Sequence, residues 1–346
     1  MLALRAPVWY NDTRNRRKRG KTMTLTELAR LAGVSVSTAS KAFGNAPDIS
    51  AETRRLVLDT ARQYGCYGKF YKGKYSKKVI AVVCPETRSA YYANFLSCLQ
   101  QKIHNMDGIM LISADEFDAA HQAELTEYYQ SYLHVDGMVV FGMLAPLKKG
   151  FDVPVVVIGR ATGSDADSVA IDLRTPMRTA QAELAARGHR AVAFIGEERT
   201  AEKAQYFAEL FQPDPSWVVC SPLRFEAAGA DGVDRLLRIG APVTALVCAY
   251  DYIAFGAVRR LNECGFRVPE DFSVIGMDNI RVAEYPDIDL ASIDSHVEEV
   301  CEIVCGLLQK KLKNPYFRVR QQISVPGDFV LRGSVGTAKD GREELG

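Results

Sequence analysis

The sequence contains no hydrophobic run that approaches the ~18 apolar residues of a membrane-spanning helix. Its first 22 residues have no apolar core of the kind found in secretory signal peptides, and residues 14–21 are nearly all charged. Membrane insertion and export are therefore not expected. These absences predict a cytoplasmic protein without a membrane partner.

Metal-binding and catalytic signatures are also missing. Among the eight cysteines, Cys301 and Cys305 lie one helical turn apart, but no second pair or histidine cluster accompanies them. Reduced, structural thiols are the interpretation that suits a cytoplasmic chain. The sequence has no Gly-x-Ser-x-Gly elbow, Walker loop or dinucleotide-binding glycine fingerprint. We therefore expect no enzyme activity, no catalytic residue, no cofactor and no metal, and we interpret His189 as structural.

Acidic residues are scarce at one end of the chain. Residues 1–78 contain 17 Lys and Arg against 5 Asp and Glu, whereas the remainder contains 26 against 37, although the whole chain has a net charge of only +1. Without residues 1–22 the asymmetry persists, because residues 23–78 still contain 10 basic against 4 acidic residues. A basic end on an acidic body predicts that this end meets a polyanion such as nucleic acid.

The segment that follows residue 22 has the pattern of three short helices. Thr24-Leu-Thr-Glu27 is a capping box that predicts a helix start. Gly33-Val-Ser35 predicts a tight turn before a second helix over residues 36–43. A third helix is predicted over residues 51–64, ending at Gly65. Two short helices around a glycine turn, supported by a third, are typical of DNA-reading modules whose second helix enters the major groove.

The residues of this segment resemble the LacI/GalR family of bacterial repressors. Residues 25–41 read Leu-Thr-Glu-Leu-Ala-Arg-Leu-Ala-Gly-Val-Ser-Val-Ser-Thr-Ala-Ser-Lys, which is similar to that family's opening motif at nearly every position. Asn45, residues 49–54 and residues 61–65 continue the resemblance. The resemblance implies a sequence-specific DNA-binding transcriptional regulator, a repressor, whose partner is double-stranded DNA.

The resemblance also implies which residues contact DNA. Val36, Ser37 and Lys41 would face base edges: Lys41 can donate to guanine O6 and N7, and Val36 can pack on a thymine methyl group. Other side chains would hold phosphates or sugars, which positions the helix without reading sequence. These residues are Thr24, Ser35, Thr38, Ser40 and Asn45.

Residues 1–22 are polar and basic and have no helical or strand period. Two interpretations remain open. In the one we favour, translation starts at Met23 and the preceding segment is a start-site artefact. In the other, the segment is a basic arm that adds non-specific phosphate contacts.

Residues 66–78 depart from the family, in which this region forms a short hinge helix with a leucine wedge. Here there is no leucine, the glycines disfavour a helix, and five lysines suit a path along phosphates. Phe70 or Tyr71 could replace the wedge, since apolar side chains can open base steps. The alternative, which we prefer slightly, is a flexible basic linker without groove insertion.

From Val79 onward, apolar runs alternate with helical patterns, which is typical of βα units. One series of predicted strands covers residues 79–83, 109–112, 137–141 and 155–158. A second series covers residues 168–171, 191–195, 217–220, 245–248 and 273–275. Two such series predict two lobes built on doubly wound parallel sheets. Further strings resemble the family's sensor, which is similar to periplasmic sugar-binding proteins; they are residues 154–160, 171–172, 188–190, 268–278 and 332–334.

The predicted fold is therefore an N-terminal all-α helix-turn-helix domain plus a two-lobed α/β sensor that is periplasmic-binding-protein-like. The expected divisions are a basic extension (1–22), the DNA-binding domain (23–65), a hinge or linker (66–78), an N-lobe (79–160 and 291–320), a C-lobe (161–290 and 321–334) and a polar tail (335–346). The tail has no leucine heptad that would support a tetramer, so a homodimer is expected.

The expected ligand site is the cleft between the lobes, because ligands bind at the carboxyl ends of parallel strands. The resemblance implies that Asp278 takes sugar hydroxyls and that Lys203 replaces a family arginine. A carboxylate, a cation and aromatic faces suit a polyol. Lys203 could instead be a solvated helix residue, Asp251 is more readily a helix N-cap than a ligand contact, and Tyr91 could belong to a dimer surface. The candidate ligand-binding residues are Ser89, Tyr91, Lys203, Tyr250 and Asp278.

Two other functions compete with this interpretation. An enzyme would need one of the missing catalytic motifs, and a periplasmic solute-binding protein would need export and no helix-turn-helix. We therefore expect a homodimer that reads a near-palindromic operator. A small ligand, a carbohydrate, would close or twist the lobes and so change the affinity for DNA.

Overall fold

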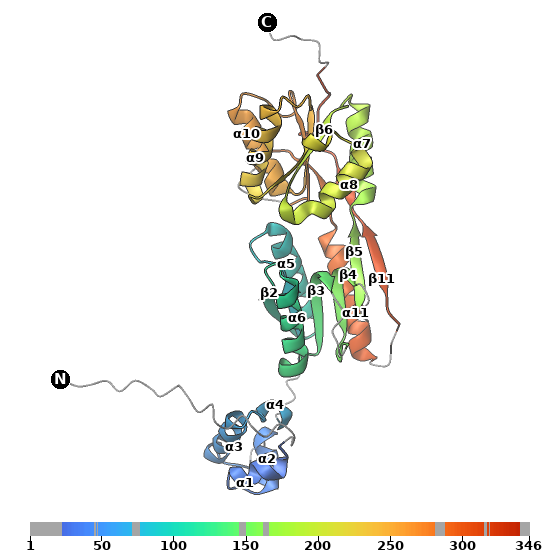
Figure 1. Ribbon diagram of the computed structural model, residues 1–346. Coiled ribbons are helices and arrows are strands. Elements are labelled where there is room, and N and C mark those ends of the chain that lie inside the picture. The colour runs from blue at the N-terminus through green and yellow to red at the C-terminus, as the bar shows by residue number, and fades with distance from the viewer. Residues whose placement is uncertain are drawn as a thin grey trace, which may run out of the picture. The chain divides into compact units, whose positions relative to one another are not determined.

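The computed structural model describes residues 23–44, 46, 48–70, 77–144, 150–161, 166–280, 288–314, 317 and 319–339 (Figure 1). The chain divides into two compact units, Met1–Ser76 and Lys77–Gly346. No helix within the described ranges is both long and apolar enough to cross a membrane. Residues 1–22, about which two interpretations were open, lie outside the described ranges.

The first unit is a small helical domain, as predicted. Its helices are α1 (Leu25–Leu31), α2 (Val36–Phe43), α3 (Ala51–Gln63) and the short α4 (Tyr67–Phe70). Hydroxyl caps fix the three helix starts: Thr24 and Glu27 form the capping box, and Ser35 and Ser50 accept hydrogen bonds from the amides of Thr38 and Thr53. Gly33 adopts the left-handed backbone, with φ of 66°, that the turn between α1 and α2 requires.

The short helix α4 packs onto the core of this domain. The Phe43 ring lies 6.2 Å from the Tyr67 ring and 5.8 Å from the Phe70 ring, between ring centres. Lys69 donates a hydrogen bond of 2.7 Å to the Met23 carbonyl oxygen. We call Phe43, Tyr67 and Phe70 the aromatic clasp. The predicted linker therefore begins with a helical turn that belongs to the DNA-binding domain, while Tyr71 lies outside the described residues.

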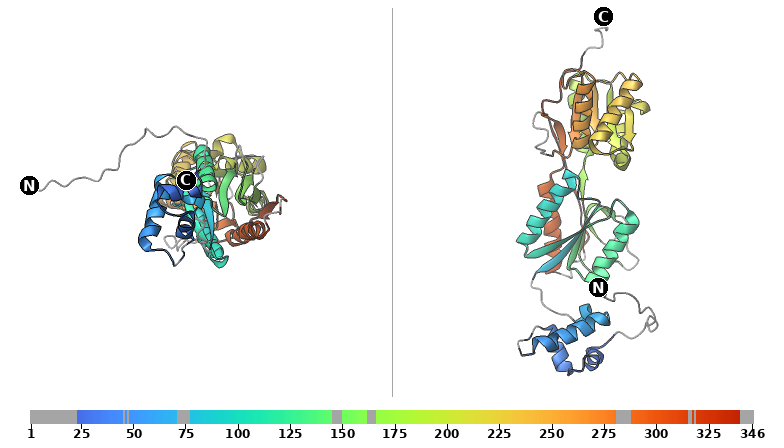
Figure 2. Two further views of the ribbon diagram at one scale, coloured as in Figure 1. Left: turned by 90° about the horizontal axis from the view of Figure 1, so that it is seen from below. Right: turned by 90° about the vertical axis from the view of Figure 1, so that its left-hand side faces the viewer.

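The second unit contains two six-stranded sheets (Figures 1 and 2). The first has the order β11-β5-β4-β3-β1-β2 and consists of β1 (Lys78–Cys84), β2 (Gly108–Ala114), β3 (Gly137–Leu144), β4 (Val155–Ala161), β5 (Asp167–Asp172) and β11 (Gln322–Pro326). The second has the order β12-β10-β9-β8-β6-β7 and consists of β6 (Val192–Glu197), β7 (Val218–Ser221), β8 (Ala245–Cys248), β9 (Ser273–Met277), β10 (Ala291–Asp294) and β12 (Asp328–Val330). All neighbouring strands are parallel except β10 and β12.

Helices cover both faces of each sheet, which confirms the predicted doubly wound fold (Figure 2). In β1, Ile80 and Val82 pack with α5 and α11, whereas Ala81 and Val83 pack with Tyr129 of the opposite layer. The helices of the first lobe are α5 (Ala90–Asn105), α6 (Ala119–Tyr128) with its π-helical extension η2 (Tyr129–Leu133), and α11 (Val297–Lys313). Those of the second lobe are α7 (Arg174–Ala186), α8 (Ala201–Phe211), α9 (Phe225–Arg238), α10 (Asp251–Glu263) and the single turns η3 (Glu198–Thr200) and η4 (Pro215–Trp217).

The lobe boundaries differ from those predicted. Residues 167–172 and 322–326 were expected in the C-lobe, but β5 and β11 pair with each other and complete the first sheet. Residues 291–294 were expected in the N-lobe, but β10 lies in the second sheet. The chain therefore crosses between the lobes after β5, after β10 and after β11. Apolar runs identify buried strands but do not say which strands are their neighbours, so the sequence pattern could not place these crossings.

The start of the predicted polar tail is part of the second lobe. Val335 is buried, and the Gly336 carbonyl oxygen lies 3.2 Å from Nε2 of His189. The same buried imidazole contacts the hydroxyls of Thr244 at 2.8 Å and Ser273 at 2.9 Å. Burial lowers the pKa of His189. His189 thus has the structural surroundings that we predicted for it.

Candidate functional sites

The exposed face of α2 is the candidate DNA-reading surface. Ala39, Ala42 and Phe43 are buried in the core of the first unit, which leaves the opposite face of the helix free. Because the exposed side chains are mostly small, the helix backbone can approach base edges closely. The exposed residues of this face are Val36, Ser37, Ser40 and Lys41.

Two of the predicted phosphate-contacting hydroxyls, those of Thr24 and Ser35, also serve as helix caps. The Thr24 hydroxyl accepts from the Glu27 amide at 3.2 Å, and the Ser35 hydroxyl lies 2.8 Å from that of Thr38. These hydroxyls are therefore held at the start of α1 and α2. Asn45, the remaining predicted contact, lies outside the described residues. DNA contact by these residues stays a prediction.

An ion pair at the end of α2 was not predicted. The Lys41 ammonium contacts the carboxylate of Asp48, in the segment between α2 and α3. Its hydrogen bond lowers the pKa of Asp48. Both side chains are about half exposed, at 46% and 54%, so the pair does not fix Lys41 strongly and a guanine can compete for its ammonium.

A cavity of about 230 Å³ lies between the two lobes of the second unit. All five candidate ligand-binding residues line it, so the structure brings together groups that are up to 189 positions apart, from Ser89 to Asp278. Ligand binding by these five residues stays a prediction. The full lining consists of Glu86, Ser89, Tyr91, Tyr92, Phe117, Glu197, Arg199, Thr200, Glu202, Lys203, Arg224, Phe225, Tyr250 and Asp278.

Lys203 and Asp278 form the charged floor of the cavity. The Lys203 ammonium lies 3.6 Å from a carboxylate oxygen of Asp278 and donates a 2.7 Å hydrogen bond to the Ala249 carbonyl oxygen. Burial raises the pKa of Asp278, while Lys203 opposes that shift. Asp278 also has a φ of 95°, a conformation that is rare outside glycine and collects at ligand sites. Lys203 is thus a cavity residue and not only a solvated residue of α8.

Asp251 stabilises the backbone next to Asp278 through hydrogen bonds. Tyr250, not Asp251, is the N-cap residue of α10, which corrects our preferred interpretation of Asp251 as the cap. The buried Asp251 carboxylate accepts hydrogen bonds from the Ile280 amide at 2.8 Å and from the Ser292 hydroxyl at 2.7 Å. Burial and the nearby charge of Asp278 raise the pKa of Asp251 to about 8. Asp251 therefore holds the segment that carries Asp278.

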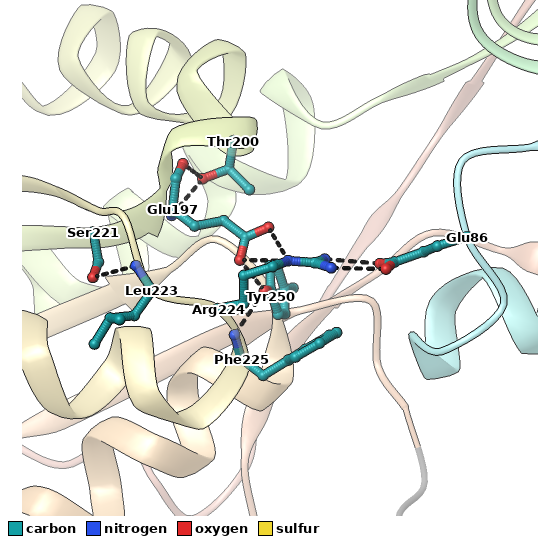
Figure 3. A network of polar contacts seen from close by, with 8 residues as sticks. All are labelled: Glu86, Glu197, Thr200, Ser221, Leu223, Arg224, Phe225 and Tyr250. Carbon is teal, nitrogen blue, oxygen red and sulfur yellow. Dashed lines mark hydrogen bonds and ion pairs between the residues drawn. The ribbon is translucent and has the colours of Figure 1, made fainter. Parts of the chain in front are cut away.

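The side chains at the mouth of the cavity were missed by sequence reasoning (Figure 3). Arg224 donates two 2.8 Å hydrogen bonds to Glu86, and its Nε lies 3.3 Å from a carboxylate oxygen of Glu197. The Tyr250 hydroxyl donates to Glu197 at 2.7 Å. Burial and this hydrogen bond raise the pKa of Tyr250, which keeps the phenol protonated. The available signal was position: Glu86 follows β1 and Arg224 follows β7, at the carboxyl ends of parallel strands.

Aromatic rings complete the mouth. The guanidinium of Arg199 lies 4.4 Å from the centre of the Phe117 ring, and that of Arg224 lies 5.7 Å from the same ring. Phe117 has a positive φ of 64° in the loop after β2. Arg224 also lies 4.4 Å from the Phe225 ring. Guanidinium groups thus pack against aromatic rings around the opening of the cavity.

Comparison with known proteins identifies the families that the two units resemble. Residues 24–66 match the family model of bacterial regulatory proteins, lacI family, and residues 182–335 match that of the periplasmic binding protein-like domain. The chain thus contains a LacI-family DNA-binding domain followed by a periplasmic binding protein-like domain. It is 24% identical over 340 residues to the HTH-type transcriptional repressor CytR of Escherichia coli K12, an alignment that covers 92% of this chain and 98% of CytR.

Solved structures confirm the predicted LacI-family fold. The Lac repressor dimer bound to operator and the anti-inducer ONPF is 20% identical, with a TM-score of 0.65, and the match covers 91% of this chain and all of that chain. A LacI-family regulator from Enterococcus faecium with bound ribose is 22% identical, with a TM-score of 0.63, over 76% of this chain and all of that chain.

The relatives named here are transcriptional regulators. Within the part of the chain that the structure describes, no group of three or more His, Cys, Asp or Glu side chains is arranged to hold a metal ion.

Proposed function

We propose that this LacI-family protein is a sequence-specific transcriptional repressor whose affinity for an operator is controlled by a carbohydrate bound between the lobes of its sensor. The observation that carries the proposal is the pairing of two sites in one chain. One unit exposes the α2 face, and the other encloses a cavity of about 230 Å³ with polar and aromatic walls.

The cavity chemistry supports a carbohydrate as the ligand. Its volume of about 230 Å³ lies below the range of about 300–1,000 Å³ typical of drug-sized ligand sites. This size favours a ligand on the scale of a monosaccharide. The Asp278 carboxylate and the Lys203 ammonium are suited to hydroxyl groups, and the Tyr91 and Tyr250 rings to the apolar face of a sugar. The Enterococcus relative contains ribose, which is consistent with this class.

The DNA-binding mode follows from symmetry. A homodimer presents two copies of α2, so its operator would be near-palindromic with half-sites set by the two-fold axis. The Lac repressor, which has the same fold, is a dimer on its operator. We propose that the protein acts in the cytoplasm, where the operator is, and that it regulates without enzymatic turnover of its ligand.

Ligand control would operate through a shift between lobe arrangements. A carbohydrate that contacts both lobes binds the closed arrangement better than the open one, and it shifts the population by that difference in affinity. The three chain crossings after β5, β10 and β11 are where the backbone would bend.

Selection from random duplexes tests the proposal. The full chain would be incubated with the pool at physiological salt, and the retained sequences determined. Recovery of an inverted repeat is expected, and it would provide an assay for screening monosaccharides. Retention that is salt-sensitive but without sequence preference would contradict sequence-specific regulation.

A further inference from the structure

Two side chains from opposite lobes form a two-point ion pair across the cavity mouth. Glu86 follows β1 of the first sheet, and Arg224 lies between β7 and α9 of the second lobe. Both terminal nitrogens of Arg224 donate to Glu86, each at 2.8 Å (Figure 3). This fork-to-fork geometry is the strongest arrangement of a guanidinium with a carboxylate, and it restricts direction as well as distance.

The pair is partly buried, and Glu86 is its less exposed partner. The Glu86 side chain is 12% exposed and that of Arg224 is 28% exposed. The hydrogen bond to Glu86 raises the pKa of Arg224 further above its ordinary value. In such surroundings the loss of one partner leaves the other charge poorly solvated, so breaking the pair is costly.

The second lobe holds Arg224 in place for this contact. The Glu197 side chain is only 4% exposed, and its carboxylate lies beside Arg224 Nε. Glu197 in turn accepts from the Tyr250 hydroxyl, which also accepts from the Phe225 amide at 3.2 Å. Arg224 is therefore oriented by its own lobe, and Glu86 is the partner that comes from the other.

A second contact between the lobes is much weaker by comparison. Arg160, at the end of β4, lies 3.0 Å from Glu202 of α8, but the two side chains are 58% and 60% exposed. Water competes effectively for such a pair. Of these two ion pairs, the one between Glu86 and Arg224 has the burial and geometry needed to bias the lobes.

We propose that Glu86 and Arg224 are positioning residues of the sensor, whose ion pair biases the two lobes toward the closed arrangement before a carbohydrate binds and leaves the carbohydrate to complete the shift. The pair consists only of side chains of this chain, so it requires no ligand atom. A sensor biased toward closure loses less free energy in ordering its site, and it binds its effector more tightly. The inference rests on the proposed function in that it takes this cavity as the effector site.

Hydrogen exchange of the full chain, without DNA or carbohydrate, tests the proposal. Glu86→Gln keeps the shape of the side chain and removes its charge. We expect amides at the cavity mouth to exchange about tenfold faster or more, because even a partly buried charge pair is costly to break. The increase should appear on both lobes, around residues 86–92 and around residues 197–203 and 224–226. Amides of β3 and β8 should be unchanged and so report that both sheets remain folded.

Two further variants make the test specific. Glu86→Gln should add nothing in an Arg224→Gln background, because the pair is already broken there. Glu209→Gln is the matched control: it removes a 2.6 Å ion pair with Arg174 that lies within the second lobe. The proposal would be overturned if Glu86→Gln increased amide exchange in the first lobe only. It would also be overturned if the increase were equal in the wild-type and Arg224→Gln backgrounds. Since the assay uses no operator, either result is independent of whether the protein binds DNA.

Discussion

Lys41 is the longest of the four side chains exposed on α2, and its neighbours Val36, Ser37 and Ser40 reach much less far. Replacing Lys41 by Ala should cost about 1–3 kcal/mol at one base position and relax specificity there, since a lysine can donate to guanine O6 and N7. Selection from random duplexes would measure the change. Arg55→Ala is the control, because it removes an exposed cation on α3 and should leave base preference unchanged. An unaltered preference in the Lys41 variant would remove that residue from base reading.

Asp278 is the residue on which ligand response should depend most. Asp278→Asn is the suitable change, because asparagine tolerates the positive φ of this position better than alanine does. Loss of a charged acceptor should weaken effector binding by about 1.5–3 kcal/mol and leave operator affinity unchanged. Calorimetry with the screened carbohydrate measures the first quantity, and a gel shift the second. Asp234→Asn, which alters an ion pair with Arg260 outside the cavity lining, should bind carbohydrate normally.

At the residue scale, the sequence identified the cavity floor better than its mouth. Asp278 stands in a string that resembles a known family, residues 268–278, and Lys203 stands where that family has an arginine. Glu86 and Arg224 stand in loops whose conformation no local pattern predicts, and their contact spans 138 positions. A contact of that kind depends on how two lobes meet, which is a property of packing and not of spacing.

The aromatic clasp makes α4 part of the DNA-binding domain. Because Phe70 is half-buried against Phe43, its replacement by Ala should destabilise this domain by about 1–3 kcal/mol. Trypsin cleavage of the full chain at Arg54 and Arg55 of α3 should become about tenfold faster or more, since cleavage tracks the open population. Tyr64→Ala is the matched aromatic control, because that ring is 49% exposed. Equal cleavage rates in the two variants would argue against the clasp.

The clasp also bears on the alternatives for the linker. A Phe70 side chain packed on Phe43 is not free to open a base step, which favours the linker without groove insertion over insertion by Phe70. Sequence composition correctly identified the missing leucine but not the packing of Tyr67 and Phe70. Glycines at residues 65 and 68 argue against a helix, and tertiary contacts outweigh that propensity over one short turn.

The segment after β12 is fixed to the second lobe by a histidine that must stay neutral. Because burial lowers the pKa of His189, the unfolded chain binds more protons than the folded one below the ordinary pKa of 6.5. Stability is therefore complete above pH 6.5 and falls as the pH decreases, by up to about 1.4 kcal/mol per pH unit. Urea denaturation at a series of pH values should reveal this slope, and His189→Gln should flatten it. A wild-type curve that is flat down to pH 5 would contradict the prediction.

At the element scale, the sequence pattern predicted β1 to β9 but not β10, β11 and β12, and it assigned β5 to the wrong lobe. β5 has the apolar residues of a buried strand, but nothing in residues 168–171 distinguishes pairing with β4 from pairing with β6. β11 is an edge strand in which only Val325 is buried, so its apolar pattern is weak. The sheet to which a strand belongs is decided by the segments that connect the strands, and these segments have no hydrophobic periodicity. The predicted fold class therefore survives, while the division between lobes had to come from the structure.

Dimerisation is the prediction for the whole molecule. Sedimentation should give about twice the chain mass of 38.2 kDa. Altering one half-site of the selected operator should weaken binding far more than altering a base pair outside both half-sites, because a dimer gains its second contact at high effective concentration. A chain that sediments as a monomer and binds single half-sites equally well would contradict the dimer.

The placement of β11 has a consequence for how the protein is made. This strand, Gln322–Pro326, completes the sheet that begins with β1 at Lys78, so one edge of the N-lobe is supplied only after β6 to β10 of the other lobe have been synthesised. At about 5–20 residues per second, the ribosome needs some tens of seconds to make the intervening chain, and β5 stays unpaired on that side meanwhile. A nascent or prematurely terminated chain therefore exposes an open sheet edge. Such truncated products are expected to depend on chaperones or be degraded, so that the chains that accumulate are those that include β11.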